Sequence, residues 1–143
     1  MTPKRSRSDG LGRLLVTVYA LFALAAGARS AVQIATKFGD APLAYLLSAL
    51  AAVIYLVAAI CLSRSSALSW RTAVVALAIE LAGVLIVGTA SIVFADSFPD
   101  ATVWSDYGVG YGFIPLVLPI VGLVWLLRPG TRRDFSTVGG FTD

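Results

Sequence analysis

The sequence contains no histidine and only one cysteine, Cys61. Without histidine there can be no haem axial pair, no His-based catalytic triad and no Cys/His zinc cluster. A lone cysteine cannot form an intramolecular disulfide, and in an apolar segment such a thiol usually packs as a small buried residue. The remaining residues offer no nucleophile beside a suitable base. We therefore expect a protein that is not an enzyme and that holds no metal or cofactor.

Charged residues are also scarce, at 13% of the chain, whereas 58% of its residues are hydrophobic and the mean hydropathy is +0.86. A soluble domain has about 25% charged residues, so the apolar excess is too large for a core. Four apolar segments account for it, at about 14–36, 42–62, 72–94 and 107–127. About 20 helical residues cross a hydrocarbon layer of about 30 Å. The sequence predicts an all-α membrane domain over 14–127, with four transmembrane helices in one antiparallel bundle.

Basic residues gather on one side of this predicted membrane domain. Of the eleven Lys and Arg residues, nine precede the first span, separate the second from the third or follow the fourth. The other two connections contain only Lys37 as a basic residue, against Asp40, Asp96, Asp100 and Asp106. The positive-inside rule then predicts a bacterial plasma-membrane protein with both termini in the cytoplasm. The basicity orients the chain against its lipid partner and does not indicate a nucleic-acid partner.

The two ends of the chain are polar. Residues 1–13 and 128–143 are predicted to be disordered cytoplasmic tails, the first of them basic. The first span contains Ala26-Gly27-Ala28, which has the form of a signal-peptidase site. The apolar pattern continues beyond it to Ala35, as expected for an uncleaved helix, but the sequence leaves cleavage open.

Two charged residues lie inside the predicted spans, Arg29 in the first and Glu80 in the third. An intramembrane carboxylate is costly and faces protein or water rather than lipid. At about 1.5 Å per residue, Glu80, Tyr55 and Arg29 fall at compatible depths, and Gln33 and Lys37 continue the polar face of Arg29. We predict a network of Arg29, Gln33, Tyr55 and Glu80, with an Arg29–Glu80 pair supported by Tyr55. Three alternatives stay open: Arg29 extends outward to the headgroups, Glu80 is a neutral acid, or the network only fixes helix register.

The stretch from Phe98 to Leu127 resembles two known motifs superficially. Val109-Gly110-Tyr111-Gly112 matches part of the potassium-channel filter, but Gly108 replaces its threonine. After it only residues 113–127 remain, about 22 Å of helix, which is too short to cross a membrane. A dinucleotide site is also excluded, because the run is not GxGxxG and follows no strand.

Glycine and proline weaken the fourth span instead. An irregular half-span is tolerated only when protein covers it or when it lines a cavity. We therefore predict an outer cavity that is formed by Trp104, Asp106 and Tyr111.

Two stretches, GARSAVQIATKFGDAPLAYLLSALAAVIYLVA and FPDATVWSDYGVGYGFIPLVLPIVGLVWLL, together resemble a family of small, uncharacterised four-span membrane proteins from high-GC Gram-positive bacteria. The resemblance covers about residues 16–127. It implies the four-span topology and brings no activity, ligand or site residue.

Two functions fit these features. The first is a non-catalytic accessory or interaction subunit, because Ala23, Gly27 and Ala31 form a small-residue face that suits close helix packing. Its partners would be other membrane proteins or further copies of itself. The alternative is a small transporter or permeation protein in which Arg29, Tyr55 and Glu80 line a polar path. Such a protein would need to form oligomers to enclose the path.

Overall fold

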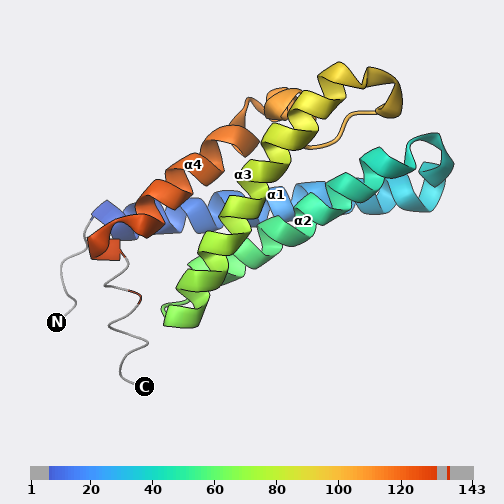
Figure 1. The fold of residues 1–143 in the computed structure, drawn as a ribbon. Coiled ribbons are helices and arrows are strands. Elements are labelled where there is room, and N and C mark those ends of the chain that lie inside the picture. The colour runs from blue at the N-terminus through green and yellow to red at the C-terminus, as the bar shows by residue number, and fades with distance from the viewer. Residues whose placement is uncertain (1–6, 132–134, 136–143) are drawn as a thin grey trace.

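The structure, a computed structural model, describes residues 7–131 and residue 135, and all regular elements in this part of the chain are helical. Its long helices are α1 (Arg7–Lys37), α2 (Pro42–Leu62), α3 (Ala67–Val93) and α4 (Ile114–Leu127), and its short 3-10 helices are η1 (Phe38–Asp40), η2 (Ala95–Ser97) and η3 (Ser105–Tyr111) (Figure 1). The predicted all-α class is therefore confirmed for these residues. Three helices are long and apolar enough to cross a membrane, or four if η3 and α4 form one broken span.

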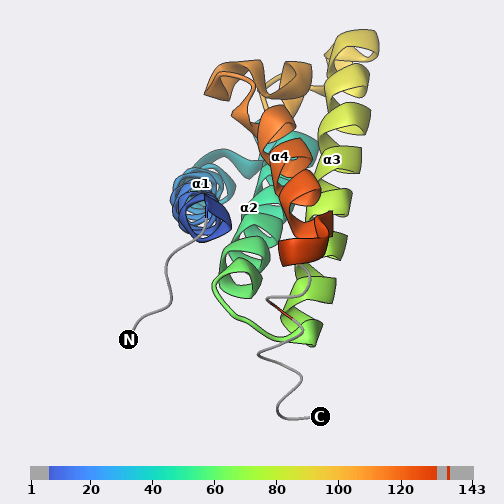
Figure 2. The same ribbon diagram turned by 90° about the vertical axis from the view of Figure 1, so that its left-hand side faces the viewer.

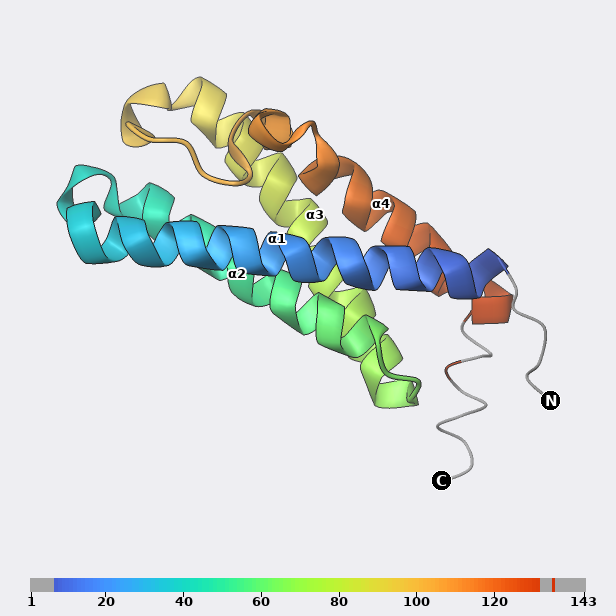
Figure 3. The same cartoon turned by 180° about the vertical axis from the view of Figure 1, so that it is seen from behind.

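The long helices run back and forth between two ends of the molecule (Figures 1 and 3). The first end holds η1 and the segment 95–111, and the second holds the start of α1, the α2–α3 connection and the end of α4. α2 packs against α1 and α3, and α4 packs against α3. In Figure 2, α1 is seen nearly end-on, whereas α3 runs from bottom to top in the plane of the picture. α1 therefore crosses α3 steeply.

Local sequence signals explain where α2 and α3 begin. α2 has the predicted bounds, and Pro42 occupies the first turn, where its missing N–H leaves no hydrogen bond unmade. α3 begins earlier than the predicted residue 72, because the side chain of Ser66 accepts a hydrogen bond from the amide of Ser69 and caps the helix.

Both predicted tails are shorter than expected. α1 begins at Arg7, so residues 7–13 are helical, and Gly12 lies against the ring of Trp125 from α4. On the C-terminal side, Thr131 and Phe135 are buried, and the Phe135 ring stands edge-on to that of Trp125 with 6.1 Å between centroids. Contact with this tryptophan orders chain that composition alone marks as tail. The rest of the predicted tails, at 1–6, 132–134 and 136–143, lies outside the described residues.

The fourth span is not one helix over 107–127. α4 begins only at Ile114, and η3 meets it at an angle of 97°. Left-handed backbone at Gly112 and Phe113 accompanies this break, and a separate kink inside η3 has positive φ at Asp106, Tyr107 and Gly108. The predicted irregularity of this half-span is therefore confirmed, and it takes the form of a sharp turn.

Large apolar side chains face outward and small ones lie between the helices. Leu24, Leu68 and Ile86 are each about two-thirds exposed or more, whereas Ala51 and Ala73 are fully buried. This distribution is the reverse of that in a soluble core, and small residues between helices are typical of membrane domains.

Candidate functional site

The centre of the candidate site is Glu80, which α3 places completely out of contact with solvent. Tyr19, equally buried on α1, donates a hydrogen bond from its hydroxyl to Oε1 of Glu80 at 2.5 Å. Oε2 of Glu80 is also buried, and it has no hydrogen-bond partner among the described residues. One oxygen of the carboxyl group is thus satisfied and the other is not.

Two more aromatic rings complete the surroundings of this carboxyl group. The Tyr55 ring from α2 lies 5.9 Å from that of Tyr19, measured between centroids. The Tyr55 hydroxyl accepts a hydrogen bond from Nε1 of Trp104 at 2.9 Å. The Trp104 ring rests on Gly83, one turn along α3 from Glu80, where a methyl group would lie 2.7 Å from a ring carbon. We name Glu80, Tyr19, Tyr55 and Trp104 the Glu80 cluster.

Trp104 reaches this depth because the segment 102–105 is buried among the helices. Serine hydroxyls accept hydrogen bonds from backbone amides of this segment and of the residue after it. The Ser48 hydroxyl of α2 accepts from the Val103 amide at 3.3 Å, and the Ser91 hydroxyl of α3 accepts from the Asp106 amide at 2.9 Å. Backbone donors that are buried outside regular structure need partners of this kind. Side chains of the helices therefore hold the segment in place.

A second glycine of α3 receives a second aromatic ring. A side chain at Gly88 would overlap the ring of Tyr107, which therefore lies directly on the helix backbone. The Tyr107 hydroxyl is also 2.8 Å from that of Thr89. Gly83 and Gly88 together give α3 a surface on which the segment 95–111 can lie closely.

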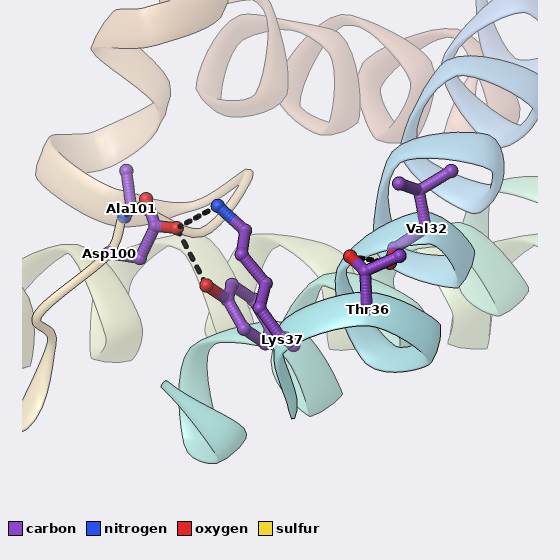
Figure 4. Close-up of polar contacts among 6 residues, drawn as sticks. Val32, Thr36, Lys37, Asp100 and Ala101 are labelled. Carbon is purple, nitrogen blue, oxygen red and sulfur yellow. Dashed lines mark hydrogen bonds and ion pairs between the residues drawn. The ribbon is translucent and has the colours of Figure 1, made fainter. Parts of the chain in front are cut away.

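The segment is also fastened at its start, where Asp100 faces the end of α1 (Figure 4). Nζ of Lys37 lies 3.7 Å from Oδ2 of Asp100, the Tyr45 hydroxyl donates to the same oxygen at 2.9 Å, and the Ala101 amide donates to Oδ1. The hydrogen bond from Tyr45 lowers the pKa of Asp100 below its ordinary value. Partial burial opposes this, but the Ala101 amide and Lys37 lower the pKa further.

The structure does not bring Arg29 to Glu80 as predicted. Nη1 of Arg29 donates instead to the Tyr111 hydroxyl at 3.0 Å, in an exposed position. The reason is the steep crossing of α1 and α3, which sets Tyr19 level with Glu80, about 15 Å before Arg29 along the helix axis. Tyr55 does lie in the cluster, but its hydroxyl bonds to Trp104 and not to Glu80.

Gln33 also departs from the predicted network. It is buried on α1, and no recorded hydrogen bond joins its amide to Arg29, Tyr55 or Glu80.

The three residues of the predicted outer cavity belong to one segment, with Trp104 just before η3 and Asp106 and Tyr111 within it. Trp104 is only 2% exposed, and its ring occupies the volume between the helices. Asp106 is exposed, and Tyr111 is half-buried, with its ring 5.7 Å from that of Phe22 between centroids.

Two hollows lie on outward faces of the molecule. A groove of about 330 Å³ between α1 and α2 has small residues of both helices in its floor. It is lined by Ala20, Ala23, Leu24, Gly27, Ala52, Val53 and Leu56, and we name it the α1–α2 groove. A second hollow, of about 540 Å³, lies along the last turns of α3 and is lined almost wholly by apolar atoms of Leu85, Ile86, Thr89, Ala90, Val93 and Phe94.

Sequence reasoning missed Tyr19 and gave Trp104 a different place. A hydroxyl in the middle of an apolar span is the signal that could have identified Tyr19, as it did for Tyr55. No comparable signal predicts that Trp104 leaves the outer interface, because its position depends on the glycines of another helix.

The chemistry that this cluster offers is limited to one carboxyl group among aromatic rings. In the described part of the chain, no three His, Cys, Asp or Glu side chains gather so that they could hold a metal ion. No protein-family model, curated protein or solved structure matches the chain.

Proposed function

We propose that this chain is a multi-pass protein of the bacterial plasma membrane, with four spans in an antiparallel bundle, and that it acts there as a non-catalytic interaction subunit. The membrane location rests on the three long apolar helices and the broken fourth span. It also rests on the large apolar side chains that these helices expose, which are stable against lipid and not against water.

The charges at the two ends of the molecule support an orientation with both termini in the cytoplasm. Among the described residues the second end carries Arg13, Arg64, Arg71 and Arg128, whereas the basic side chains that contact the first end are Lys37 and Arg29. Basic residues accumulate on the cytoplasmic side of membrane proteins. The segment 95–111 would then lie at the extracytoplasmic side.

The observation that carries the interaction role is the exposure of α1. In its most apolar stretch of 18 residues only 22% is buried, against 44% in the corresponding stretch of α2 and 39% in that of α3. The α1–α2 groove opens on this helix, with Ala20, Ala23 and Gly27 allowing a close approach. Helices associate in membranes through such small-residue surfaces. A partner helix in the groove would cover the least buried face of the molecule.

The test is purification in a gentle detergent followed by mass spectrometry. We expect a partner at a stoichiometric amount, and we expect Ala20→Leu and Ala23→Leu to remove it by filling the groove. Ala82→Leu is the matched control, because it enlarges an exposed alanine of α3 in the same way. A protein that is monomeric and alone after gentle extraction, or that loses its partner equally in the control, contradicts the proposal.

A small transporter or permeation protein is the second candidate, and Glu80 is the observation that favours it. A carboxyl group that is fully buried where three helices meet, with one oxygen unpartnered, is unusual for a purely structural position. Flux into proteoliposomes tests this function. A flux that Glu80→Gln abolishes supports transport, and equal flux with and without the protein excludes it for the solutes that are tried.

A further inference from the structure

We propose that Glu80 is a proton-binding site and that Trp104 closes the route by which its proton exchanges with the first end of the molecule. This inference goes beyond an interaction role, because it assigns a ligand and a gate to residues that the α1–α2 groove does not include.

An ionised Glu80 would carry a charge that its surroundings do not compensate. An ionised carboxylate that is removed from water is strongly destabilising unless an opposite charge and further hydrogen bonds compensate. Tyr19 supplies one hydrogen bond to Oε1, and Oε2 has none among the described residues. Among the described residues an ion pair joins Lys37 and Asp100, and it does not involve Glu80. A proton on Oε2 removes the uncompensated charge.

In the described part of the chain, the elements packed against Glu80 place no cation beside its carboxyl group. The titratable side chain that α1 presents to Glu80 is Tyr19, and the one from α2 is Tyr55. The segment 95–111 contributes Trp104, which does not titrate. α4 contains no charged or titratable side chain between Ile114 and Leu127. The proton is therefore the ligand that fits this site.

The proton of Glu80 would exchange towards the first end and not towards the second. Towards the second end, Leu15 and Leu77 lie one turn before Tyr19 and Glu80 on their helices, and both are almost fully buried. Regular helices that pack at this level close that side. On the other side, the Tyr19 hydroxyl donates to Glu80, the Tyr55 ring lies 5.9 Å from the Tyr19 ring between centroids, and Nε1 of Trp104 donates to the Tyr55 hydroxyl.

Trp104 belongs to an irregular segment and can leave the Glu80 cluster more easily than a helix can. The backbone amides of Val103 and Trp104 donate to the side-chain hydroxyls of Ser48 and Thr102 and not to the carbonyl groups of a helical ladder. Asp106 and Tyr107, which follow, adopt left-handed backbone that non-glycine residues rarely populate because it is strained. Segments of this kind open locally more often than packed helices do. Trp104 is thus the movable part of the Glu80 cluster.

Infrared difference spectroscopy of the full chain in lipid vesicles tests the bound proton. At neutral pH we expect the carbonyl band of a protonated carboxylic acid, present in the wild type and lost in Glu80→Gln. Tyr19→Phe keeps the acid but removes its hydrogen bond, so it should move the band to higher frequency. This second variant serves if Glu80→Gln does not fold. A wild type without the band, or a band that neither variant changes, overturns the bound proton.

Transfer of the same vesicles to D₂O tests the gate through the rate at which the band shifts. We expect Trp104→Ala to accelerate exchange about tenfold or more, because local opening is no longer needed. Trp125→Ala is the matched control, since it removes another buried tryptophan at the second end. An unchanged rate in Trp104→Ala, or equal acceleration in both variants, overturns the role of Trp104 as a gate.

Discussion

Two glycines of α3 determine where the aromatic rings of the segment 95–111 can lie. Gly83 and Gly88 face Trp104 and Tyr107 at distances that leave no room for a side chain. Neither glycine is needed for its backbone conformation, because both lie within a regular helix. Their role is to let a ring approach the helix backbone.

Gly83→Ala should therefore destabilise the protein in spite of the higher helix propensity of alanine. The new methyl group would lie 2.7 Å from the Trp104 ring, which must move and weaken its hydrogen bond to Tyr55. Overpacking of this kind costs about 1–3 kcal/mol. Unfolding in detergent measures the change. Gly10→Ala is the control, because nothing lies near that position, and equal behaviour of the two variants would contradict the close contact.

Asp100 should make the stability of the fold depend on pH. Its pKa is lowered in the folded state, so the carboxylate stabilises the fold above its ordinary pKa of about 4. This stabilisation is lost as the pH falls through the lowered folded pKa, because the protonated acid loses Lys37 and accepts less strongly from Tyr45. Thermal unfolding across that acidic range should show a steeper loss in the wild type than in Asp100→Asn. Parallel curves would exclude the contribution of Asp100.

At the scale of elements, the break between η3 and α4 separates what local sequence can predict from what it cannot. Glycine and proline content predicts that the outer half of the fourth span is irregular, since both residues weaken helices. The direction of the chain after the break depends instead on Ser91 and Gly88 of α3, which receive it. Local pattern contains no information about that partner helix.

The kink inside η3 predicts an unusual substitution. Asp106 has φ of 50° and an exposed side chain, and glycine adopts this backbone without strain. Asp106→Gly should keep or raise the free energy of unfolding by up to about 1 kcal/mol, whereas Asp106→Val should lower it by at least as much. Denaturation in detergent measures both. Asp96→Gly is the control at an exposed aspartate without positive φ, and it should give no gain.

At the scale of the whole molecule, hydropathy predicted the helices well because it depends only on composition. It placed α2 at its observed bounds and the C-terminal ends of the other three helices to within one residue, whereas their predicted starts differ by five to seven residues. The Arg29–Glu80 pair failed because depths counted along each helix are comparable only between nearly parallel helices. The steep crossing of α1 and α3 brings Tyr19 to Glu80 instead. That angle follows from packing across the entire bundle.

The proposed orientation predicts different accessibility at the two ends. In a Cys61→Ala background, Asp96→Cys and Ser65→Cys place single thiols at exposed positions of the first and second ends. A membrane-impermeant maleimide should label the first variant in intact cells and the second only after the membrane is opened. The reverse pattern would show that the orientation is inverted.

The shortness of α4 has a consequence for the surrounding lipid. Its 14 residues extend about 21 Å, and η3 turns away at 97° instead of lengthening it. A hydrocarbon layer of about 30 Å beside this helix would meet hydrophobic mismatch, which lipid relieves by local thinning and proteins relieve by association. The perimeter of the molecule is therefore uneven. Its α4 side would deform the bilayer, while α1, with 31 residues, is long enough to cross it.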